Sequence, residues 1–290
     1  MRIGINTPVV TRFPGSHSPW EASAGIEEIA QIAAAADRLE FHHLTCSEHV
    51  AVPAPLAEAR GGTYWDPLST LGYLAARTDR IRLATQVLVL GYHHPLEIAK
   101  RYGTLDAISA GRLILGLGVG SLREEFELLD VPFDDRGLRA DDALLALRSA
   151  LSGRQPSYSG RYYRFAEMIV DPHAVQPKVP LWIGGRSARS LRRACELGDG
   201  WVPFGLAFDE LRALLSRRQL PEGFEVVLAT GHLDPLQDPV MARQQLERAA
   251  RAGATIVSVG LNATSADHYC EQLAALADIR IRHFPSPEKG

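Results

Sequence analysis

Short apolar runs alternate with amphipathic runs from one end of this 290-residue chain to the other. The runs expected to form strands are Arg2–Asn6, His42–Ser47, Ile81–Leu90, Leu113–Gly118, Leu181–Gly184, Gly200–Pro203, Glu225–Gly231 and Thr255–Gly260. The runs expected to form helices are Gly25–Leu39, Pro67–Thr78, Pro95–Ser109, Leu138–Leu151, Ser187–Leu197, Phe208–Arg218, Pro239–Ala252 and Ser265–Ala277. Eight strand–helix units in order close a parallel barrel, which needs about 250 residues. The sequence therefore predicts an α/β fold, a TIM (β/α)8 barrel, in one domain over residues 1–290.

Two segments depart from this alternation. The segment 153–179 is longer than a helix-to-strand loop should be, and within it Ser157–Phe165 predicts a hairpin that turns at Ser159-Gly160. We therefore expect an insertion before the fifth strand. The segment Val50–Asp66 follows the second strand and is rich in proline, alanine and glycine. We expect it to be a non-helical lid over the barrel mouth.

Composition excludes several classes of protein. A net charge of -3 and a pI near 6.4 give no reason to expect binding to nucleic acid or to an anionic membrane surface. No apolar run approaches the roughly 18 residues of a spanning helix, and no targeting segment precedes the first strand, so we expect a cytoplasmic protein. The cysteines, Cys46, Cys195 and Cys270, are far apart and form no CxxC pair. They predict reduced thiols rather than a disulfide framework or a structural zinc site.

Glu48 and His49 stand at the carboxyl end of the second expected strand. Barrel enzymes keep their catalytic residues at this end of the strands, and a histidine of near-neutral pKa serves there as general acid or base. The alternative is a surface or hydrogen-bonded imidazole with no role. His93 and His94 invite a metal site with His49, but adjacent histidines on a turn point apart, and no carboxylate has a ligand-like spacing. We therefore predict no metal site.

The run Gly116–Ser121 is rich in glycine and invites a dinucleotide-binding interpretation. The third glycine of a GxGxxG motif would have to stand at position 121, where the chain has Ser121, and eight strands in barrel order exclude a doubly wound sheet. Two interpretations remain open for these glycines. They either let a flat ring system approach the backbone or supply a turn that needs positive φ.

The stretch from Gly184 to Ser190 combines two glycines, a helix-capping Ser187 and the cations Arg186 and Arg189, with Arg192 and Arg193 just beyond. A helix N-terminus prefers negative charge by about 0.3–1 kcal/mol, so clustered cations there are unfavourable unless an anion lies between them. Glycines, a hydroxyl and a positive helix end form a phosphate cradle. The alternative is that these arginines extend into solvent.

Together these motifs resemble the luciferase-like monooxygenase superfamily, most closely its actinobacterial-type branch that uses the deazaflavin coenzyme F420. The resemblance covers nearly the whole chain. It is carried by Ala84–Leu88, Tyr92–Pro95, Asp106–Arg112, Gly116–Ser121 with Glu124–Phe126, Val131–Phe133, Gly160–Tyr163, Pro180–Gly185 and Leu197–Trp201.

The resemblance implies a TIM barrel with an insertion before strand five and a cis peptide bond at Gln86–Val87. It also implies where a cofactor would bind. The phosphate would lie at Gly184, Gly185 and Arg186, and the ring near Gln86, Val87, Gly118, Gly120 and Ser121. His49 matches the catalytic histidine of some deazaflavin dehydrogenases, and the preceding Glu48 would orient it. Ser121 departs from the glutamate proton donor that the sugar-phosphate dehydrogenases of the family carry.

The function that follows from the resemblance is hydride transfer between C5 of F420 and a small organic substrate, with His49 exchanging the proton. Two alternatives remain: an FMN-dependent luciferase-like monooxygenase, and a non-catalytic barrel that binds the cofactor. A homodimer is also expected, because dimers are common among members of this family.

Overall fold

The computed structural model describes residues 1–284. Its main sheet has the order β3-β2-β1-β11-β10-β9-β8-β5-β4, and a further pairing of β3 with β5 closes the ring. Every pairing in this sheet is parallel. The strands are β1 Arg2–Ile5, β2 His43–Cys46, β3 Arg82–Thr85, β4 Leu88–Val89, β5 Leu113–Gly118, β8 Leu181–Gly184, β9 Gly200–Val202, β10 Glu225–Leu233 and β11 Ile256–Leu261. The predicted TIM barrel is confirmed: eight strands form the ring, and β4 lies outside it.

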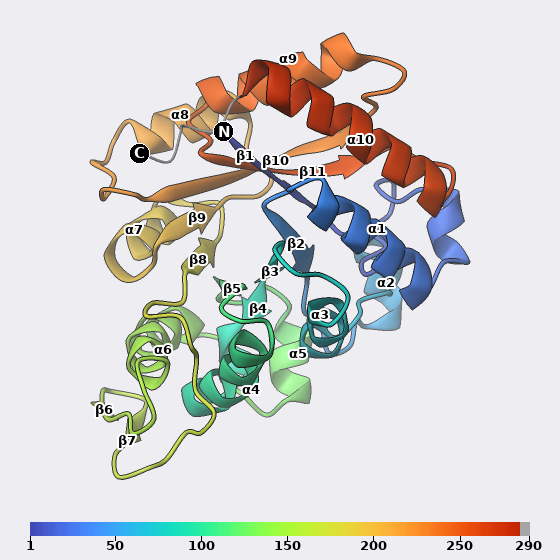
Figure 1. Cartoon of the computed structure of the whole chain (residues 1–290). Coiled ribbons are helices and arrows are strands. Elements are labelled where there is room, and N and C mark those ends of the chain that lie inside the picture. The colour runs from blue at the N-terminus through green and yellow to red at the C-terminus, as the bar shows by residue number, and fades with distance from the viewer. Residues whose placement is uncertain (285–290) are drawn as a thin grey trace.

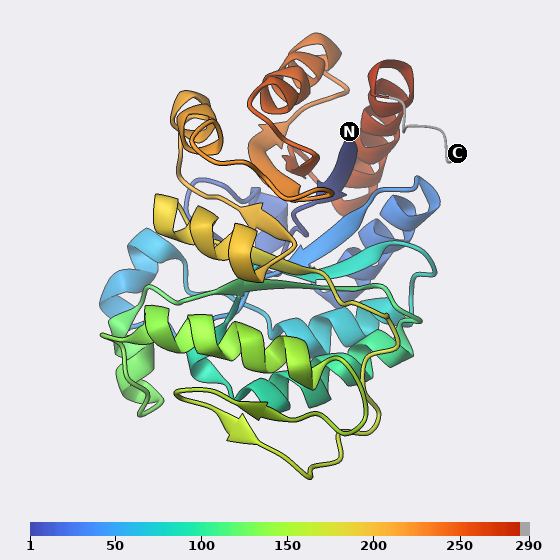
Figure 2. The same ribbon diagram turned by 90° about the vertical axis from the view of Figure 1, so that its left-hand side faces the viewer.

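Helices surround this ring (Figures 1 and 2). The last helix packs against the first, so the helical layer closes as the sheet does. The α-helices are α1 Ile26–Arg38, α2 Ala54–Arg60, α3 Pro67–Ala75, α4 Pro95–Ile108, α5 Arg123–Leu128, α6 Arg136–Ala150, α7 Ala188–Leu197, α8 Phe208–Leu215, α9 Pro239–Arg251 and α10 Ala266–His283. Short 3-10 turns cover Pro19–Ala22 and Leu90–Tyr92. Among residues 1–284 no helix has the length and apolar character needed to cross a bilayer.

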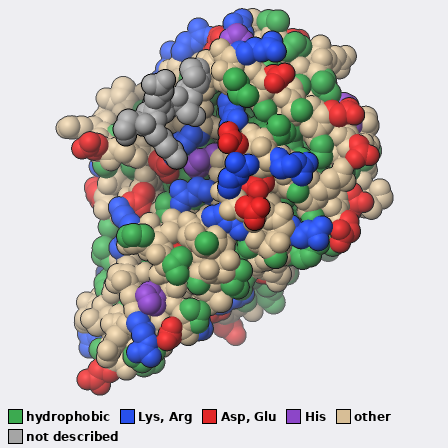
Figure 3. Space-filling view, viewed as in Figure 1, with side chains coloured by type: hydrophobic (Ala, Val, Ile, Leu, Met, Phe, Trp, Pro, Cys, Tyr) green, Lys and Arg blue, Asp and Glu red, His purple; other side chains and the backbone are tan. Residues whose placement is uncertain are grey.

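Local capping sets several helix starts. Asp238 accepts a hydrogen bond from the backbone N–H of Met241, with Pro239 at the first helical position of α9, as the sequence predicts. Asp66 caps α3 in the same way through Ser69. On the face seen in Figure 3, basic and acidic side chains are interspersed, in keeping with the small net charge.

A small cluster of buried side chains fills the inside of the ring. Neighbouring residues on the same strands belong to the main core instead, because successive side chains of a strand point to opposite faces. The inner cluster consists of Ala84, Ile114, Trp182, Val202, Val227 and Ile256. The barrel interior is thus packed below the mouth.

The third expected strand, Ile81–Leu90, is not continuous. It forms β3 and β4, separated by Gln86 and Val87, whose peptide bond is cis as the family resemblance implies. The interruption coincides with a close approach of two backbones: a Cβ on Gly116 would lie 2.0 Å from the carbonyl oxygen of Thr85. A glycine in β5 therefore lets the chain leave β3 at this level and run on over the mouth.

The expected insertion before strand five of the ring is confirmed. It carries a hairpin of β6 Tyr158–Ser159 and β7 Arg164–Phe165, which lies beside α6 in Figure 2. The turn spans residues 160–163 rather than Ser159-Gly160, since the Gly160 N–H bonds to the Tyr163 carbonyl at 2.9 Å. The carboxylate of Asp142 on α6 accepts from the Tyr158 hydroxyl and so ties the hairpin to that helix.

The prediction that Val50–Asp66 is non-helical is wrong, because α2 forms at its centre. Its alanines favour a helix, and Pro53 precedes it at the N-cap. The rest of this segment is joined to the loop after β1. Thr11 pairs with Tyr64 as an antiparallel bridge, and the Arg12 N–H bonds to the Thr63 carbonyl. These two loops are therefore held together as one unit.

Two adjacent histidines form a buried polar chain at the opposite end of the barrel, as expected for residues at a strand's start. Arg2 lies within hydrogen-bond reach of His42 Nε2, so His42 Nδ1 carries the proton and donates to His43 Nδ1 at 3.0 Å. His43 Nε2 then donates to the Ser258 hydroxyl at 3.0 Å. This assignment leaves both imidazoles neutral, and both pack against Trp182.

The stability of the fold should depend on these two histidines in mild acid. Burial, then the nearby charges of Arg82 and Arg2, lower the pKa of His43 to about 3, and burial and His43 lower the pKa of His42 to about 2. Below the usual value of 6.5 the unfolded chain binds protons that the folded chain excludes. The free energy of unfolding should therefore fall as pH falls, by up to about 1.4 kcal/mol per pH unit for each histidine.

His42→Gln removes one of these groups and keeps an acceptor for Arg2. Urea unfolding between about pH 7 and about pH 5.5, where few carboxylates titrate, should give a free energy of unfolding that changes less with pH than in wild type. His17→Gln, at an exposed position, is the control. An unchanged pH dependence in His42→Gln would show that His42 does not bind its proton differently in the two states.

Candidate functional site

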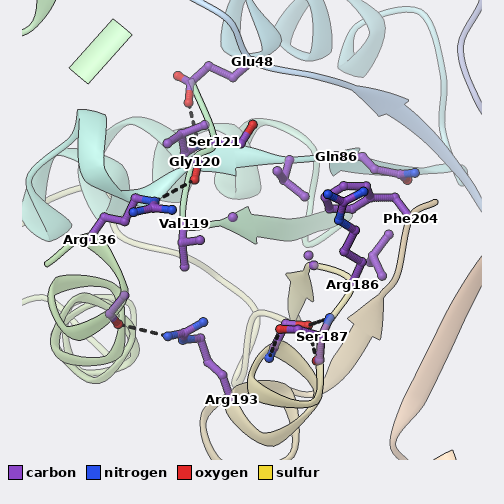
Figure 4. Close-up of a pocket in the computed structure, with 18 of the residues that line it drawn as sticks. Glu48, Gln86, Val119, Gly120, Ser121, Arg136, Arg186, Ser187, Arg193 and Phe204 are labelled. Carbon is purple, nitrogen blue, oxygen red and sulfur yellow. Dashed lines mark hydrogen bonds between the residues drawn. The ribbon is translucent and has the colours of Figure 1, made fainter. Parts of the chain in front are cut away.

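A cavity of about 1170 Å³ opens at the carboxyl ends of the barrel strands. Figure 4 shows its walls, with Gln86 and Arg186 on one side and Arg136 on the other. All the candidate site residues named from the sequence line it, although they come from four separate stretches of chain. They are Glu48, His49, Gln86, Val87, Gly118, Gly120, Ser121, Gly184, Gly185 and Arg186.

Val87 forms the floor of this cavity and explains two of its glycines. A Cβ on Gly118 would lie 2.6 Å from one Val87 methyl, and a Cβ on Gly184 would lie 3.0 Å from the other. Gly120 has φ +79°, and a Cβ there would meet Phe126 at 2.5 Å. Of the two interpretations left open, positive φ therefore holds at Gly120. Gly118 and Gly184 instead make room for the valine.

The loop between β8 and α7 has the predicted helix cap, but its two glycines do not both offer a free backbone N–H. The Ser187 hydroxyl accepts from the Ser190 N–H at 3.3 Å, which begins α7. The Gly185 N–H is not open, because it bonds to the Val202 carbonyl at 3.3 Å. The unsatisfied donors at this point are those that the first turn of any helix leaves, at Ala188 and Arg189.

Two of the four arginines expected to face an anion already have carboxylate partners. Arg193 is 4% exposed and pairs with Asp141, and Arg192 pairs with Glu196 at 3.2 Å. Both lie beyond the first turn of α7, where acidic residues of α6 and α7 are within reach. Within residues 1–284, Arg186 and Arg189 are exposed and have no carboxylate partner. The positive charge available to a ligand is therefore theirs.

A further cation on the opposite wall was missed from the sequence. Arg136 stacks on the Phe133 ring, 3.7 Å from its centroid, and its Nε donates to the Gly120 carbonyl at 3.1 Å. Arg123 covers the other side of the same ring at 4.3 Å. The signal in the sequence is a phenylalanine between two arginines, but only the fold brings this stack to the glycine turn after β5.

His49 is held by a carboxylate that had no predicted role. Its Nδ1 lies 2.7 Å from Oε2 of Glu125, and the Tyr92 hydroxyl donates to the same oxygen at 2.8 Å. The other oxygen accepts from the backbone N–H groups of Val50 at 2.7 Å and Ala51 at 3.2 Å. Burial alone would raise the pKa of Glu125, yet these hydrogen bonds together lower it, so the carboxylate is ionised. The proton on His49 is thereby directed to Nδ1.

The expectation that Glu48 orients His49 is not met. Glu48 accepts from the Val89 N–H at 2.7 Å and from His93 Nε2 at 2.6 Å, on the other side of the chain. Consecutive residues of an extended segment point in opposite directions, so Glu48 and His49 face different neighbours. Although burial opposes it, the bond to Glu48 raises the pKa of His93. Glu48 thus ties the end of β2 to β4 and to the turn after it.

The geometry gives no arrangement for a metal: residues 1–284 contain no group of three or more histidine, cysteine, aspartate or glutamate side chains that could hold an ion. The cavity instead combines an apolar floor at Val87, unpaired arginines at a helix N-terminus and a histidine with one fixed nitrogen. Such a site suits a large anionic ligand with a flat apolar part and a proton transfer beside it.

Comparison with known proteins agrees with this description. The family model described as luciferase-like monooxygenase matches residues 1–272. An uncharacterized protein of Mycobacterium tuberculosis (strain ATCC 25618 / H37Rv) is 31% identical over 246 residues, covering 81% of this chain and 86% of that protein. The F420-dependent glucose-6-phosphate dehydrogenase of Nakamurella multipartita is 31% identical over 202 residues, 68% of this chain and 57% of that enzyme.

Among solved structures, the coenzyme F420-dependent tetrahydromethanopterin reductase of Methanopyrus kandleri superposes with a TM-score of 0.73. It is 15% identical and covers 90% of this chain and 96% of its own, which shows the shared fold. Relatives of this chain include F420-dependent oxidoreductases. Because the family model spans nearly the whole chain, this protein belongs to the luciferase-like monooxygenase family.

Proposed function

We propose that this protein is an oxidoreductase that binds the deazaflavin F420 in the large cavity and moves a hydride between it and a small organic substrate. The observation that carries the proposal is the pairing of His49 with the buried Glu125 at the wall of a cavity that Val87 and Arg186 also line. The F420-dependent enzymes among the relatives support the choice of cofactor.

The residues present fit such a cofactor. A planar ring needs an apolar surface with no side chain standing over it, and Val87 between the two glycines Gly118 and Gly184 supplies one. A phosphate needs cations and open backbone donors, which Arg186, Arg189 and the first turn of α7 supply. The loops with Gln86, Gly120 and Ser121 would border the ring, and Gly185 lets the chain turn beneath the phosphate with φ +139°.

When bound, the deazaflavin supplies the hydride chemistry at its C5. The chain positions the reaction and handles the proton. With Nδ1–H directed to Glu125, His49 keeps Nε2 as the nitrogen without a protein partner among the described residues. That nitrogen can take a proton from a substrate hydroxyl or, in the reverse direction, return it. The ionised Glu125 stabilises the imidazolium that forms, and Tyr92 holds the carboxylate in place.

Arg186 should matter for binding and not for folding. It stands exposed at a helix N-terminus that disfavours positive charge, so Arg186→Ala should leave the apoprotein's thermal stability unchanged or raise it by some tenths of a kcal/mol. Loss of a charge-assisted contact to phosphate should weaken F420 binding by about 1.5–3 kcal/mol, roughly ten- to a hundredfold. Fluorescence titration with F420 measures the affinity, and thermal denaturation with and without F420 measures the stability.

Arg251→Ala, which removes an exposed charge outside the cavity, is the control for the arginine experiment. FMN is titrated in parallel, and wild type should bind F420 more tightly, with an affinity that falls as salt rises. Tighter FMN binding with NADH-driven oxygen uptake would assign the protein to the monooxygenases instead. A destabilised Arg186→Ala apoprotein with unchanged F420 affinity would make Arg186 a structural residue.

His49 and Glu125 should affect turnover and not cofactor affinity. His49→Ala should lower turnover on a substrate by roughly 10²- to 10⁴-fold, the usual contribution of a general acid or base, with F420 affinity nearly unchanged. Glu125→Gln should also lower turnover, and the hydrogen-bonded Nδ1–H resonance of His49 should disappear or shift in proton NMR spectra. Glu48→Gln should leave that resonance in place, because Glu48 does not contact His49. Loss of F420 affinity in His49→Ala would make His49 a cofactor contact.

A further inference from the structure

A second cavity, of about 310 Å³, adjoins the first at the barrel mouth. The two cavities share a wall, which is formed by Thr11, Phe13, Ser47, Gln86 and Ala229. The second cavity is built from the carboxyl ends of β1, β2, β10 and β11 and from α10. Its polar lining includes Asn6, Thr11, Glu21, Thr45, His232 and Tyr269. The proposed function gives this cavity no role.

Polar atoms without partners gather at this second cavity. In the described chain, five buried side-chain polar atoms have no hydrogen-bond partner, and three of these belong to residues that line it. They are Thr11 Oγ1 and Gln86 Oε1, whose residues lie on the wall that the two cavities share, and the Tyr269 hydroxyl, which lines the second cavity and not the first. A buried polar group left unpaired costs about 1–3 kcal/mol, so such atoms call for a hydrogen-bonding partner in the cavity. Gln86 Oε1 accepts, the Tyr269 hydroxyl donates, and the Thr11 hydroxyl can do either.

The charge of this cavity differs from that of the first. None of its lining residues, all within the described chain, is a lysine or arginine, and its carboxylate is the 5% exposed Glu21. The unpaired cations Arg186 and Arg189 line the first cavity. An anionic group in the second cavity would lose its hydration and find no cation in return, which is costly at a site of low dielectric. A hydroxyl or carbonyl group would lose little, because the unpaired atoms would replace its water.

The wall of this cavity is fixed in an unusual conformation. Val9 has φ 73°, which a β-branched residue rarely adopts, and it is fully buried. Glu21 holds the loop there by accepting from the N–H groups of Val9 at 2.8 Å and Ser18 at 2.7 Å. Elsewhere in the lining, the register of β10 against β11 shifts between Ala229 and His232, which redirects the end of β10. Strained segments of this kind occur where a ligand site must keep its shape.

We propose that the second cavity receives the polar, uncharged part of the substrate, so that the substrate is a neutral hydroxyl- or carbonyl-bearing compound and not a phosphate ester or carboxylate. Its reacting carbon would stand at the wall that Ser47 and Gln86 share between the cavities. At about 30 Å³ for each water-sized group, the cavity admits roughly ten heavy atoms of that part. The proposal rests on the proposed function and specifies the class of substrate for it.

The test compares matched neutral and anionic compounds. Saturation-transfer NMR on the apoprotein uses glucose, glycerol and cyclohexanol beside glucose 6-phosphate and glycerol 3-phosphate. Neutral compounds should bind, and Thr11→Val and Tyr269→Phe should each weaken binding by roughly two- to tenfold, the usual effect of one hydrogen bond. Because Thr11 lines both cavities and Tyr269 lines only the second, the effect of Tyr269→Phe assigns the site. Thr104→Val removes a hydroxyl on α4, outside both cavities, and should change nothing. With F420 present, the neutral compounds should also be the ones that change its absorbance.

A single added cation provides the reverse test. His232 is exposed and lines the second cavity, so His232→Lys should gain binding of the phosphate esters, in a manner that salt weakens. Preferential binding of the phosphate esters by wild type, no binding by any neutral compound, or no effect of Thr11→Val and Tyr269→Phe would each overturn the proposal. The direct F420 titration separates the two hypotheses. Neutral compounds that bind to a protein without F420 affinity would remove the proposed function and leave the second cavity as their site.

Discussion

The close approach of two backbones at the seam of the barrel determines the shape of the mouth. The Thr85 carbonyl stands where a Gly116 side chain would be, and the Thr85 hydroxyl donates to the Gly116 carbonyl at 2.7 Å. β3 and β5 can therefore pair and close the ring, while the chain leaves the ring after Thr85. This exit places Gln86 and Val87 across the mouth. Any larger residue at position 116 would push β3 and β5 apart, and Gln86 and Val87 would then lose their positions.

From this exit follows the division of the mouth into two cavities with different charge. Val87 packs its methyls over Gly118 and Gly184 and lines the large cavity, whose lining also includes Arg186 and Arg189. Gln86 lines both cavities, and the small one is polar and has no lysine or arginine among its lining residues, all of which lie in the described chain. A cofactor with a phosphate would fit the large cavity, and an uncharged part of a substrate would fit the small one. In the proposed function, this segment would lie between the two ligands, beside their reacting atoms.

A buried carboxylate organises the proton-handling part of the site. Glu125 gathers donors from the loop after β2 and from the turn after β4, and α5 carries it into that position. Four hydrogen bonds offset the cost of burying its charge, which is why its pKa falls despite burial. Removing one donor would leave a carboxylate oxygen short of partners, while removing the carboxylate would release three segments at once. Glu125 is therefore both a structural tie and the group that fixes the tautomer of His49.

The sequence by itself determined the architecture, and it predicted that the candidate site residues lie together, because both follow from local patterns. The alternation of apolar and amphipathic runs gives the strand count, and residues at strand ends must meet at one mouth, which brought His49 and Arg186 into one cavity. The choice of partners was decided only by the tertiary structure. His49 bonds to Glu125, 76 residues away, and not to the adjacent Glu48, because neighbours on an extended chain face opposite sides. Arg193 likewise finds its carboxylate on another helix. The second cavity has no sequence signal, since its walls come from opposite ends of the chain that adjoin only when the barrel closes.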